Sequence, residues 1–121
     1  MIFVKNWTVD VPEEETLLGY VGENSVRTVV FQMDSAAYSE WEFYLDMELG
    51  EQKNTVLLDK EVEGDALLLR FAVRGELLHT AGHMNAQLRA LAQDGRIKLS
   101  SLFGFEVGKS IHPVTAVPAA L

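Results

Sequence analysis

The sequence predicts an all-β protein, a two-layer antiparallel β-sandwich of about seven strands. Apolar and polar residues alternate with a period of two along most of the chain, as expected of strands buried on one face. Turn sequences rich in Gly, Asp and Asn separate the alternating segments at a spacing typical of sandwiches. The 121 residues, 48% of them hydrophobic, suffice for one domain with its own core.

The segment at residues 41–49, WEFYLDMEL, is the clearest strand. Its odd-numbered side chains are apolar, namely Trp41, Phe43, Leu45, Met47 and Leu49. Its even-numbered side chains are polar or acidic, namely Glu42, Tyr44, Asp46 and Glu48. Because successive strand side chains point to opposite faces, the first set, Trp41 included, is predicted to be buried and the second to face outward.

Five other segments alternate in the same way or have strand composition, and they are residues 2–9, 17–20, 26–33, 54–62 and 66–73. Each is treated as one strand, and the piece at 17–20 as a short or edge strand. In residues 2–9, Phe3, Trp7 and Val9 are expected to share one face. In residues 26–33, Val29, Phe31 and Met33 are expected to face inward. Residues 2–9 are also expected to form an edge strand open to a neighbour.

Residues 82–95, GHMNAQLRALAQDG, fit either a short helix or a strand. Helix formers favour the helix, but Asp94-Gly95 is a strong hairpin turn that leads into another alternating segment. We therefore predict an antiparallel hairpin of residues 84–92 with 97–107. Its second arm is expected to turn inward Ile97, Leu99, Phe103, Phe105 and Val107, with a bulge or close backbone approach at Gly104.

The connection at residues 75–82 resembles a corner of immunoglobulin-like sandwiches, where Leu, Gly and a core residue recur. Leu78, Gly82 and Met84 match that order, so an immunoglobulin-like sandwich is expected over residues 1–111. Two prolines in 112–121 indicate an extended C-terminal arm or a truncated linker, either disordered or packed on a neighbouring copy.

The charge of −8 argues against nucleic acid as a partner. Residues 1–66 carry 4 basic and 15 acidic residues, a net of −11, whereas residues 67–121 carry 6 and 3, a net of +3. Opposite charges either pair within one molecule or join copies of it, and we expect a homo-oligomer. There is no Cys, and neither a signal peptide nor a membrane span is predicted, so we expect an unexported, soluble chain.

Groups that could carry chemistry are few. His79, His83 and nearby Glu76 lie across a turn that spoils a shared helical face, and the acidic run of Asp10 and residues 13–15 lacks the spacing of a calcium loop. Carboxylates along the strand at 41–49 point into water, where nothing would raise a pKa. We therefore predict no metal, no cofactor and no catalytic residues, and expect that the protein is not an enzyme.

An interaction surface is the remaining candidate site. It is predicted from outward-facing polar and aromatic positions on neighbouring strands, namely Tyr44, Glu42, Asp46, Arg89, Arg96 and Lys98. The alternative is a carbohydrate- or ligand-binding β-sandwich module, because exposed aromatic rings can stack on sugars. Trp41 shares the core parity of its strand, which leaves Tyr44 as one exposed ring and a poor platform.

The order of segments over about residues 20–111 resembles the N-terminal domain of the baseplate upper protein of bacteriophages that infect Gram-positive hosts. The residues that carry the resemblance are Val29, Phe31, Trp41, Leu45, Gly82, Gln87, Leu88, Ala90, Ser101, Phe105, Val107, Ser110 and Ile111. It implies a non-catalytic structural or adaptor domain of a phage or prophage tail baseplate, assembled in the bacterial cytoplasm. The implied partners are other tail or baseplate proteins and further copies of the chain, three by analogy.

Overall fold

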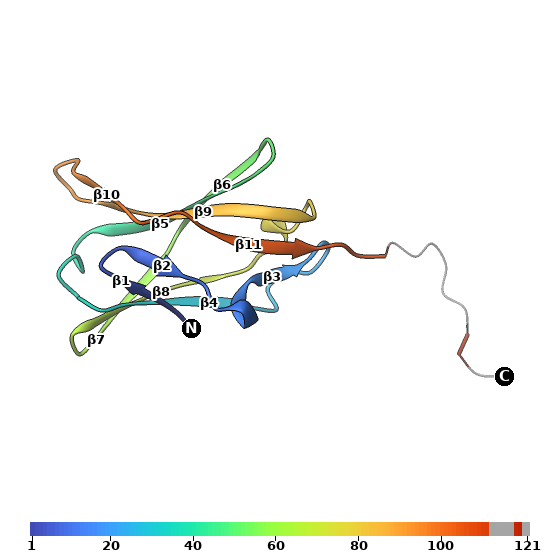
Figure 1. The fold of residues 1–121 in the computed structure, drawn as a ribbon, viewed down its shortest axis with the longest axis horizontal. Helices are drawn as coiled ribbons and strands as arrows, with labels where there is room; N and C mark the ends of the chain where they lie inside the picture. Colours follow the sequence, from blue (N-terminus) through green and yellow to red (C-terminus); the bar gives the residue numbers. More distant parts are fainter. Residues whose placement is uncertain (112–117, 120–121) are drawn as a thin grey trace.

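The computed structural model describes residues 1–111 and 118–119, and two β-sheets stack as layers around one core (Figure 1). Sheet A has five strands in the order β2-β1-β4-β8-β7. Sheet B has six, in the order β3-β11-β9-β5-β6 with β10 beside β9. The all-β prediction is confirmed. The predicted arm at 112–121 lies outside the described residues, apart from 118–119.

The strands of sheet A are β1 (Ile2–Lys5), β2 (Thr8–Asp10), β4 (Thr28–Met33), β7 (Asp59–Glu63) and β8 (Ala66–Ala72). Those of sheet B are β3 (Leu17–Tyr20), β5 (Glu42–Leu49), β6 (Gln52–Leu57), β9 (Gly82–Leu91), β10 (Ile97–Leu99) and β11 (Phe103–Gly108). The 3₁₀ turns are η1 (Glu13–Glu15) and η2 (Gly75–Leu77). Within the described ranges, no helix has the length and apolar character needed to cross a membrane.

The prediction of about seven purely antiparallel strands is wrong, because the described part of the chain forms eleven strands and both sheets are mixed. β1 runs parallel to β4, and β3 runs parallel to β11. The first 20 residues hold three short strands instead of one long one and a fragment. β1 and β3 form hydrogen-bonded pairs with β4 and β11, which are distant in sequence. Because no hairpin turn connects the two strands of either pair, the pairs need not be antiparallel.

Residues 2–9 form a hairpin, not a single strand. Asn6 and Trp7 have positive φ angles of 49° and 63°, and they turn the chain so that β1 pairs antiparallel with β2. The turn reverses the predicted parity in β1, where Ile2 and Val4 are buried and Phe3 is 59% exposed. β1 is therefore an inner strand, and β2 forms the edge of sheet A.

Residues 54–62 contribute to both sheets. β6 pairs with β5 in sheet B, and β7 pairs with β8 in sheet A. Leu58, between them, is 4% exposed, and its N–H donates to the Phe43 carbonyl at 2.9 Å. The chain thus crosses from one layer to the other through a buried leucine, which divides the single strand that the sequence predicted.

The predicted hairpin after Asp94-Gly95 is confirmed, since β10 and β11 both pair antiparallel with β9. Its predicted parity is only half right. Leu99 lies opposite Arg89, whereas Phe103 lies opposite Ala86, so the register shifts by one residue between β10 and β11. A one-residue shift moves side chains to the other face. Ile97 and Leu99 consequently point outward, while Phe105 and Val107 are buried.

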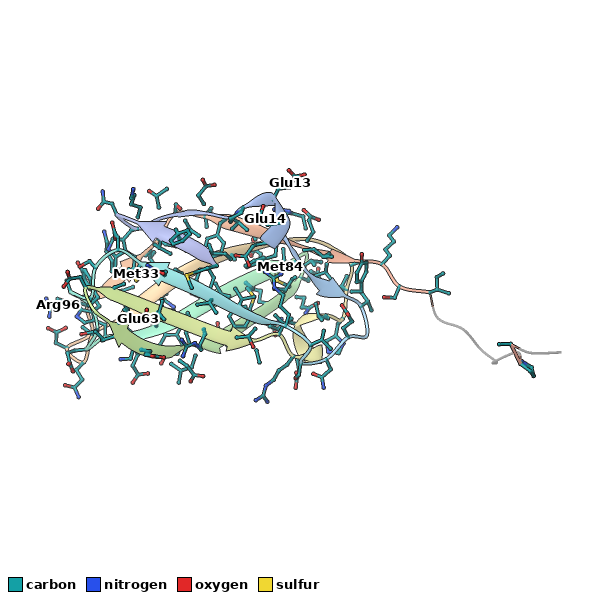
Figure 2. All side chains as sticks on the ribbon, turned by 90° about the horizontal axis from the view of Figure 1, so that it is seen from below. Glu13, Glu14, Met33, Glu63, Met84 and Arg96 are labelled. Carbon is teal, nitrogen blue, oxygen red and sulfur yellow. The ribbon has the colours of Figure 1, made fainter. Side chains whose placement is uncertain are left out.

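The core fills the space between the layers and includes the buried Met33 and Met84. Glu13 and Arg96 extend from the periphery of the domain (Figure 2). Val29, Phe31 and Met33 are buried as predicted. The corner at residues 75–82 carries the chain from β8 in sheet A to β9 in sheet B, with Leu78 buried and Gly82 at a φ of 139°. Trp41 precedes β5 and is only partly buried, so its predicted place in the core is wrong.

Candidate functional site

Four of the six residues predicted as an interaction surface meet on the outer face of sheet B. Glu42, Tyr44 and Asp46 come from β5, and Arg89 comes from the neighbouring β9. Tyr44 and Arg89 lie directly opposite each other in the register. The alternation of β5 brings them together, because its odd-numbered residues Phe43 and Leu45 point into the core.

Arg89 and Asp46 form the centre of this group. Arg89 Nε lies 2.8 Å from Asp46 Oδ2 and its Nη2 3.2 Å from Oδ1, so the pair is bidentate. Thr55 Oγ1 of β6 donates to the same carboxylate at 2.9 Å. The hydrogen bond from Arg89 lowers the pKa of Asp46, and the same bond raises the pKa of Arg89. Both groups therefore stay charged near neutral pH.

Tyr44 completes the group. The Arg89 guanidinium lies 4.6 Å from the centre of the Tyr44 ring, and the Tyr44 hydroxyl donates to Glu42 Oε2 at 3.0 Å. That hydrogen bond raises the pKa of Tyr44, so the phenol stays protonated at neutral pH. Hydrogen bonds and the ring contact thus hold these four side chains against one another.

Arg96 and Lys98 do not join the group. Arg96 pairs with Asp94 of its own turn at 2.8 Å and lies 5.2 Å from the Trp41 ring centre. The hydrogen bond from Arg96 lowers the pKa of Asp94. Lys98 Nζ lies 5.6 Å from the centre of the Trp7 ring. The two cations therefore cover the aromatic end of the sandwich, away from the cluster around Arg89.

The aromatic residues at that end contact one another. Trp7 and Trp41 each make an edge contact with Tyr38, with ring centres 5.1 and 4.8 Å apart. Trp7 also stacks on Phe43 at 6.2 Å. With cations over both indoles and Tyr38 between them, these rings pack as a satellite of the core. They do not form the flat, open platform that the carbohydrate alternative requires.

Sequence reasoning missed an apolar set on the outer face of sheet B. We call it the apolar row, and it comprises Leu57, Ile97, Leu99 and Leu102, which are 59%, 58%, 47% and 72% exposed. The register places Leu57 opposite Tyr44, Tyr44 opposite Arg89, and Arg89 opposite Leu99, in a line across four strands. The sequence does contain one sign of this change of face. The two consecutive serines, Ser100 and Ser101, interrupt the alternation of apolar and polar residues between Leu99 and Leu102.

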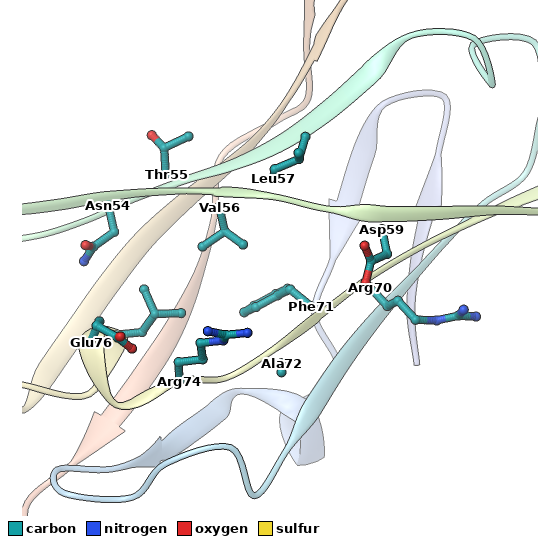
Figure 3. A pocket seen from close by; sticks show the side chains of 11 residues that line it. Asn54, Thr55, Val56, Leu57, Asp59, Arg70, Phe71, Ala72, Arg74 and Glu76 are labelled. Atoms are coloured by element: carbon teal, nitrogen blue, oxygen red, sulfur yellow. The ribbon is translucent and has the colours of Figure 1, made fainter.

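A groove of about 450 Å³ lies where the chain crosses from sheet B to sheet A (Figure 3). Asn54 and Val56 of β6 point into it, and Phe71 lies beneath them, while Thr55 and Leu57 point away. Arg74 reaches under β6. The size is in the range of small-molecule pockets, roughly 300–1,000 Å³. Its walls are β6 on one side and the end of β8 on the other, so it lies between the margins of the two sheets.

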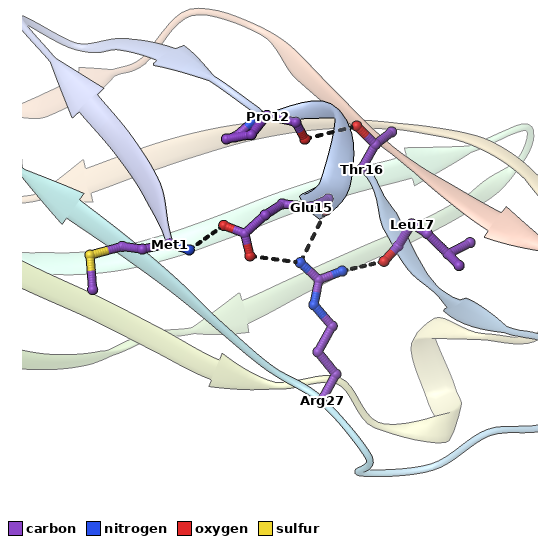
Figure 4. A network of polar contacts seen from close by, with 6 residues as sticks. All are labelled: Met1, Pro12, Glu15, Thr16, Leu17 and Arg27. Carbon is purple, nitrogen blue, oxygen red and sulfur yellow. Dashed lines mark hydrogen bonds and ion pairs between the residues drawn. The ribbon is translucent and has the colours of Figure 1, made fainter.

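The residues considered for metals do not converge. His83 pairs with Glu106 at 2.6 Å, and among the described residues no three His, Cys, Asp or Glu side chains cluster as a metal site. In the acidic run, Glu15 forms ion pairs with the Met1 ammonium and with Arg27, whose guanidinium also donates to the Leu17 and Glu15 carbonyls (Figure 4). Glu15 thus fastens the N-terminal segment to the start of β4.

Neither a protein-family model nor a curated protein sequence matches this chain.

Proposed function

We propose that this protein is a non-catalytic adaptor domain that packs against other protein subunits through the outer face of sheet B. The apolar row is the observation that carries the proposal. Four large apolar side chains, each about half exposed or more, gather on one sheet face around a satisfied ion pair. Exposed apolar side chains gathered on one face, with polar groups around them, are typical of protein interfaces.

The ion pair at the centre of the face favours a protein partner. Asp46 accepts from Arg89 and Thr55, and Tyr44 donates to Glu42, so these polar groups keep partners when the face is covered. Burying a polar group is costly mainly when it is left without a hydrogen bond. The face can therefore lose water around Leu57 and Leu99 at little polar cost, as an interface requires.

The assembly that we propose is the tail baseplate of a phage or prophage, put together in the bacterial cytoplasm, in which the chain also self-associates. The resemblance carried by residues 20–111 supports it, as does the all-β, two-layer fold. We further propose an immunoglobulin-like relationship. Sheets of order β4-β8-β7 and β11-β9-β5-β6 have the connectivity of the B-E-D and G-F-C-C′ sheets of variable-type domains, with β1 to β3 as an added N-terminal region.

The test is binding to purified tail and baseplate subunits encoded in the same phage or prophage genome. The double variant Ile97→Lys/Leu99→Lys should abolish binding, because two charges would have to be desolvated in the interface. Val26→Lys is the matched control, since Val26 is 71% exposed and lies outside the strands. Wild-type protein that retains none of these subunits, or a double variant that binds them as well as the control, would refute the proposal. Retention of glycans instead would support the carbohydrate alternative.

A further inference from the structure

Among the described residues, the two sheets end at four strands, β2, β3, β6 and β7, and the three-residue β10 beside β9 forms a further short border of sheet B. Three of the four end strands are unsuited to pair with a copy of themselves. β2 is fastened to the segment before β11, because the Val9 N–H donates to Ser101 Oγ at 2.9 Å and the Ser101 N–H donates to the Trp7 carbonyl at 2.8 Å. β3 is held by Arg27, which donates to the Leu17 carbonyl. β7, with the sequence DKEVE, carries three carboxylates in five residues. A copy of this strand would meet like charges there.

β6 forms the fourth edge, and it is open. It has one neighbour in the sheet, β5, and its sequence QKNTVL contains no acidic residue. The hairpin of β5 and β6 projects from the body of the domain (Figure 1). Among the described residues, the hydrogen bond that reaches β6 from outside sheet B is near its start, where Gln52 Nε2 donates to the Glu76 carbonyl at 3.4 Å.

The register states which backbone groups of β6 face outward. Leu58 N–H donates to the carbonyl of Phe43, which lies opposite it, so this pair is hydrogen-bonded. Hydrogen-bonded and non-hydrogen-bonded pairs alternate along antiparallel strands. The N–H and C=O groups of Val56 and Asn54 therefore point to β5, and those of Leu57, Thr55 and Lys53 point to the open edge.

We propose that β6 pairs antiparallel with β6 of a second copy, about a two-fold axis at Thr55, and so joins two B sheets into one. This names the edge for the self-association included in the proposed function. Thr55 then lies opposite its own copy, and Lys53 lies opposite Leu57 of the other chain. Thr–Thr pairs are favourable across strands. The two Lys53 side chains stand four residues apart along the strand, about 13 Å, which exceeds a Debye length of roughly 10 Å at 0.1 M salt.

The occupant is a second copy because the edge complements itself. Three residue pairs exchange backbone hydrogen bonds in this arrangement, and none of them brings like charges together. The pairing leaves the outer face of sheet B open, and Leu57 of each copy extends the apolar row across the axis. An isologous contact of this kind closes on itself, so the expected product is a dimer and not a filament.

Sedimentation of the wild type and four variants tests the proposal. Thr55→Pro removes an outward N–H but no bond to β5, and proline is tolerated in edge strands at such positions. It deletes one donor from each copy, so dimerisation should weaken at least about 30-fold. Thr55→Ala keeps the N–H, and Val62→Pro places proline on the β7 edge. Both should stay within about threefold of wild type.

Thr55→Lys provides a second disruption that does not depend on proline. In one chain the new ammonium faces Asp46, but across the axis two like charges stand opposite each other. Its dimer should be weaker at low salt and recover as salt is added. If the wild type dimerises and both Thr55→Pro and Thr55→Lys dimerise as strongly, the assignment of the contact to the β6 edge is wrong, although the protein still self-associates. A wild type that stays monomeric would overturn both, while binding through the apolar row would still be tested separately.

Discussion

Replacing Ser100 with alanine should destabilise the domain, mainly because a buried backbone N–H would lose its acceptor. Ser100 is 5% exposed, and its Oγ accepts the Leu88 N–H at 2.9 Å and donates to the Ser101 carbonyl at 2.8 Å. Leu88 is fully buried, so its N–H cannot turn to water in the variant. A buried donor without a partner costs about 1–3 kcal/mol. For a domain of this size, the Tm should fall by about 4–12 °C.

Ser101→Ala is the matched control, because it removes the same hydroxyl one residue later. Ser101 Oγ also accepts a backbone N–H, that of Val9 at 2.9 Å, but Ser101 itself is exposed. The side chain of Val9 is buried, but its N–H points outward from the edge strand β2 toward the exposed Ser101. Water can therefore replace that partner, so the control should lose less than about 1 kcal/mol. Urea unfolding followed by tryptophan fluorescence measures both. Equal losses, or a larger loss in Ser101→Ala, would refute the role assigned to burial of the Leu88 N–H.

Phe43→Ala should cost about 3–5 kcal/mol in free energy of unfolding, because Phe43 is fully buried, whereas Trp41→Ala should cost clearly less. Urea unfolding measures both, and equal losses would contradict the position of Trp41 at the margin of the core. Asp46→Asn should flatten the loss of stability in acid. The pKa of Asp46 is lower in the folded state, so this carboxylate stabilises the fold above about pH 4. That stabilisation disappears as the pH falls through the folded-state pKa of Asp46, and Tm measured from pH 7 to 2 would detect its absence in the variant. Micromolar Zn²⁺ or Ca²⁺ should leave the Tm unchanged, and a rise of several degrees would contradict the prediction of no metal site.

The strand pattern was predictable wherever a strand runs without interruption. The parity of β5 and β4 gave the correct inward faces because nothing breaks their alternation. The pattern misled where a turn or bulge lies inside an alternating run. Trp7 at a positive φ is an unusual turn residue, so the β1–β2 hairpin left no ordinary signal in the sequence. Leu58 likewise continues an apolar run while the chain changes sheets.

The candidate site was predictable in part for the same reason. Glu42, Tyr44, Asp46 and Arg89 were placed correctly on one outer face, since their strands are regular. The apolar row was not, because the one-residue shift between β10 and β11 turned Ile97 and Leu99 outward. For the same reason, Arg96 and Lys98 were predicted on the outer face with Arg89 but lie apart from it, near the rings of Trp41 and Trp7. Local alternation specifies a face only until the next change of register.

The position of β11 between β3 and β9 has a consequence for synthesis of the chain. β3 spans Leu17–Tyr20, but its sheet partner spans Phe103–Gly108. At about 5–20 residues per second, a ribosome needs roughly 4–17 s to make the intervening chain. During that interval β3 has no sheet partner, and at its end the newly made β9 (Gly82–Leu91) exposes the border that β11 later covers. A chain interrupted before Phe103 would keep both borders open, and premature termination there should yield aggregates, not a smaller folded domain.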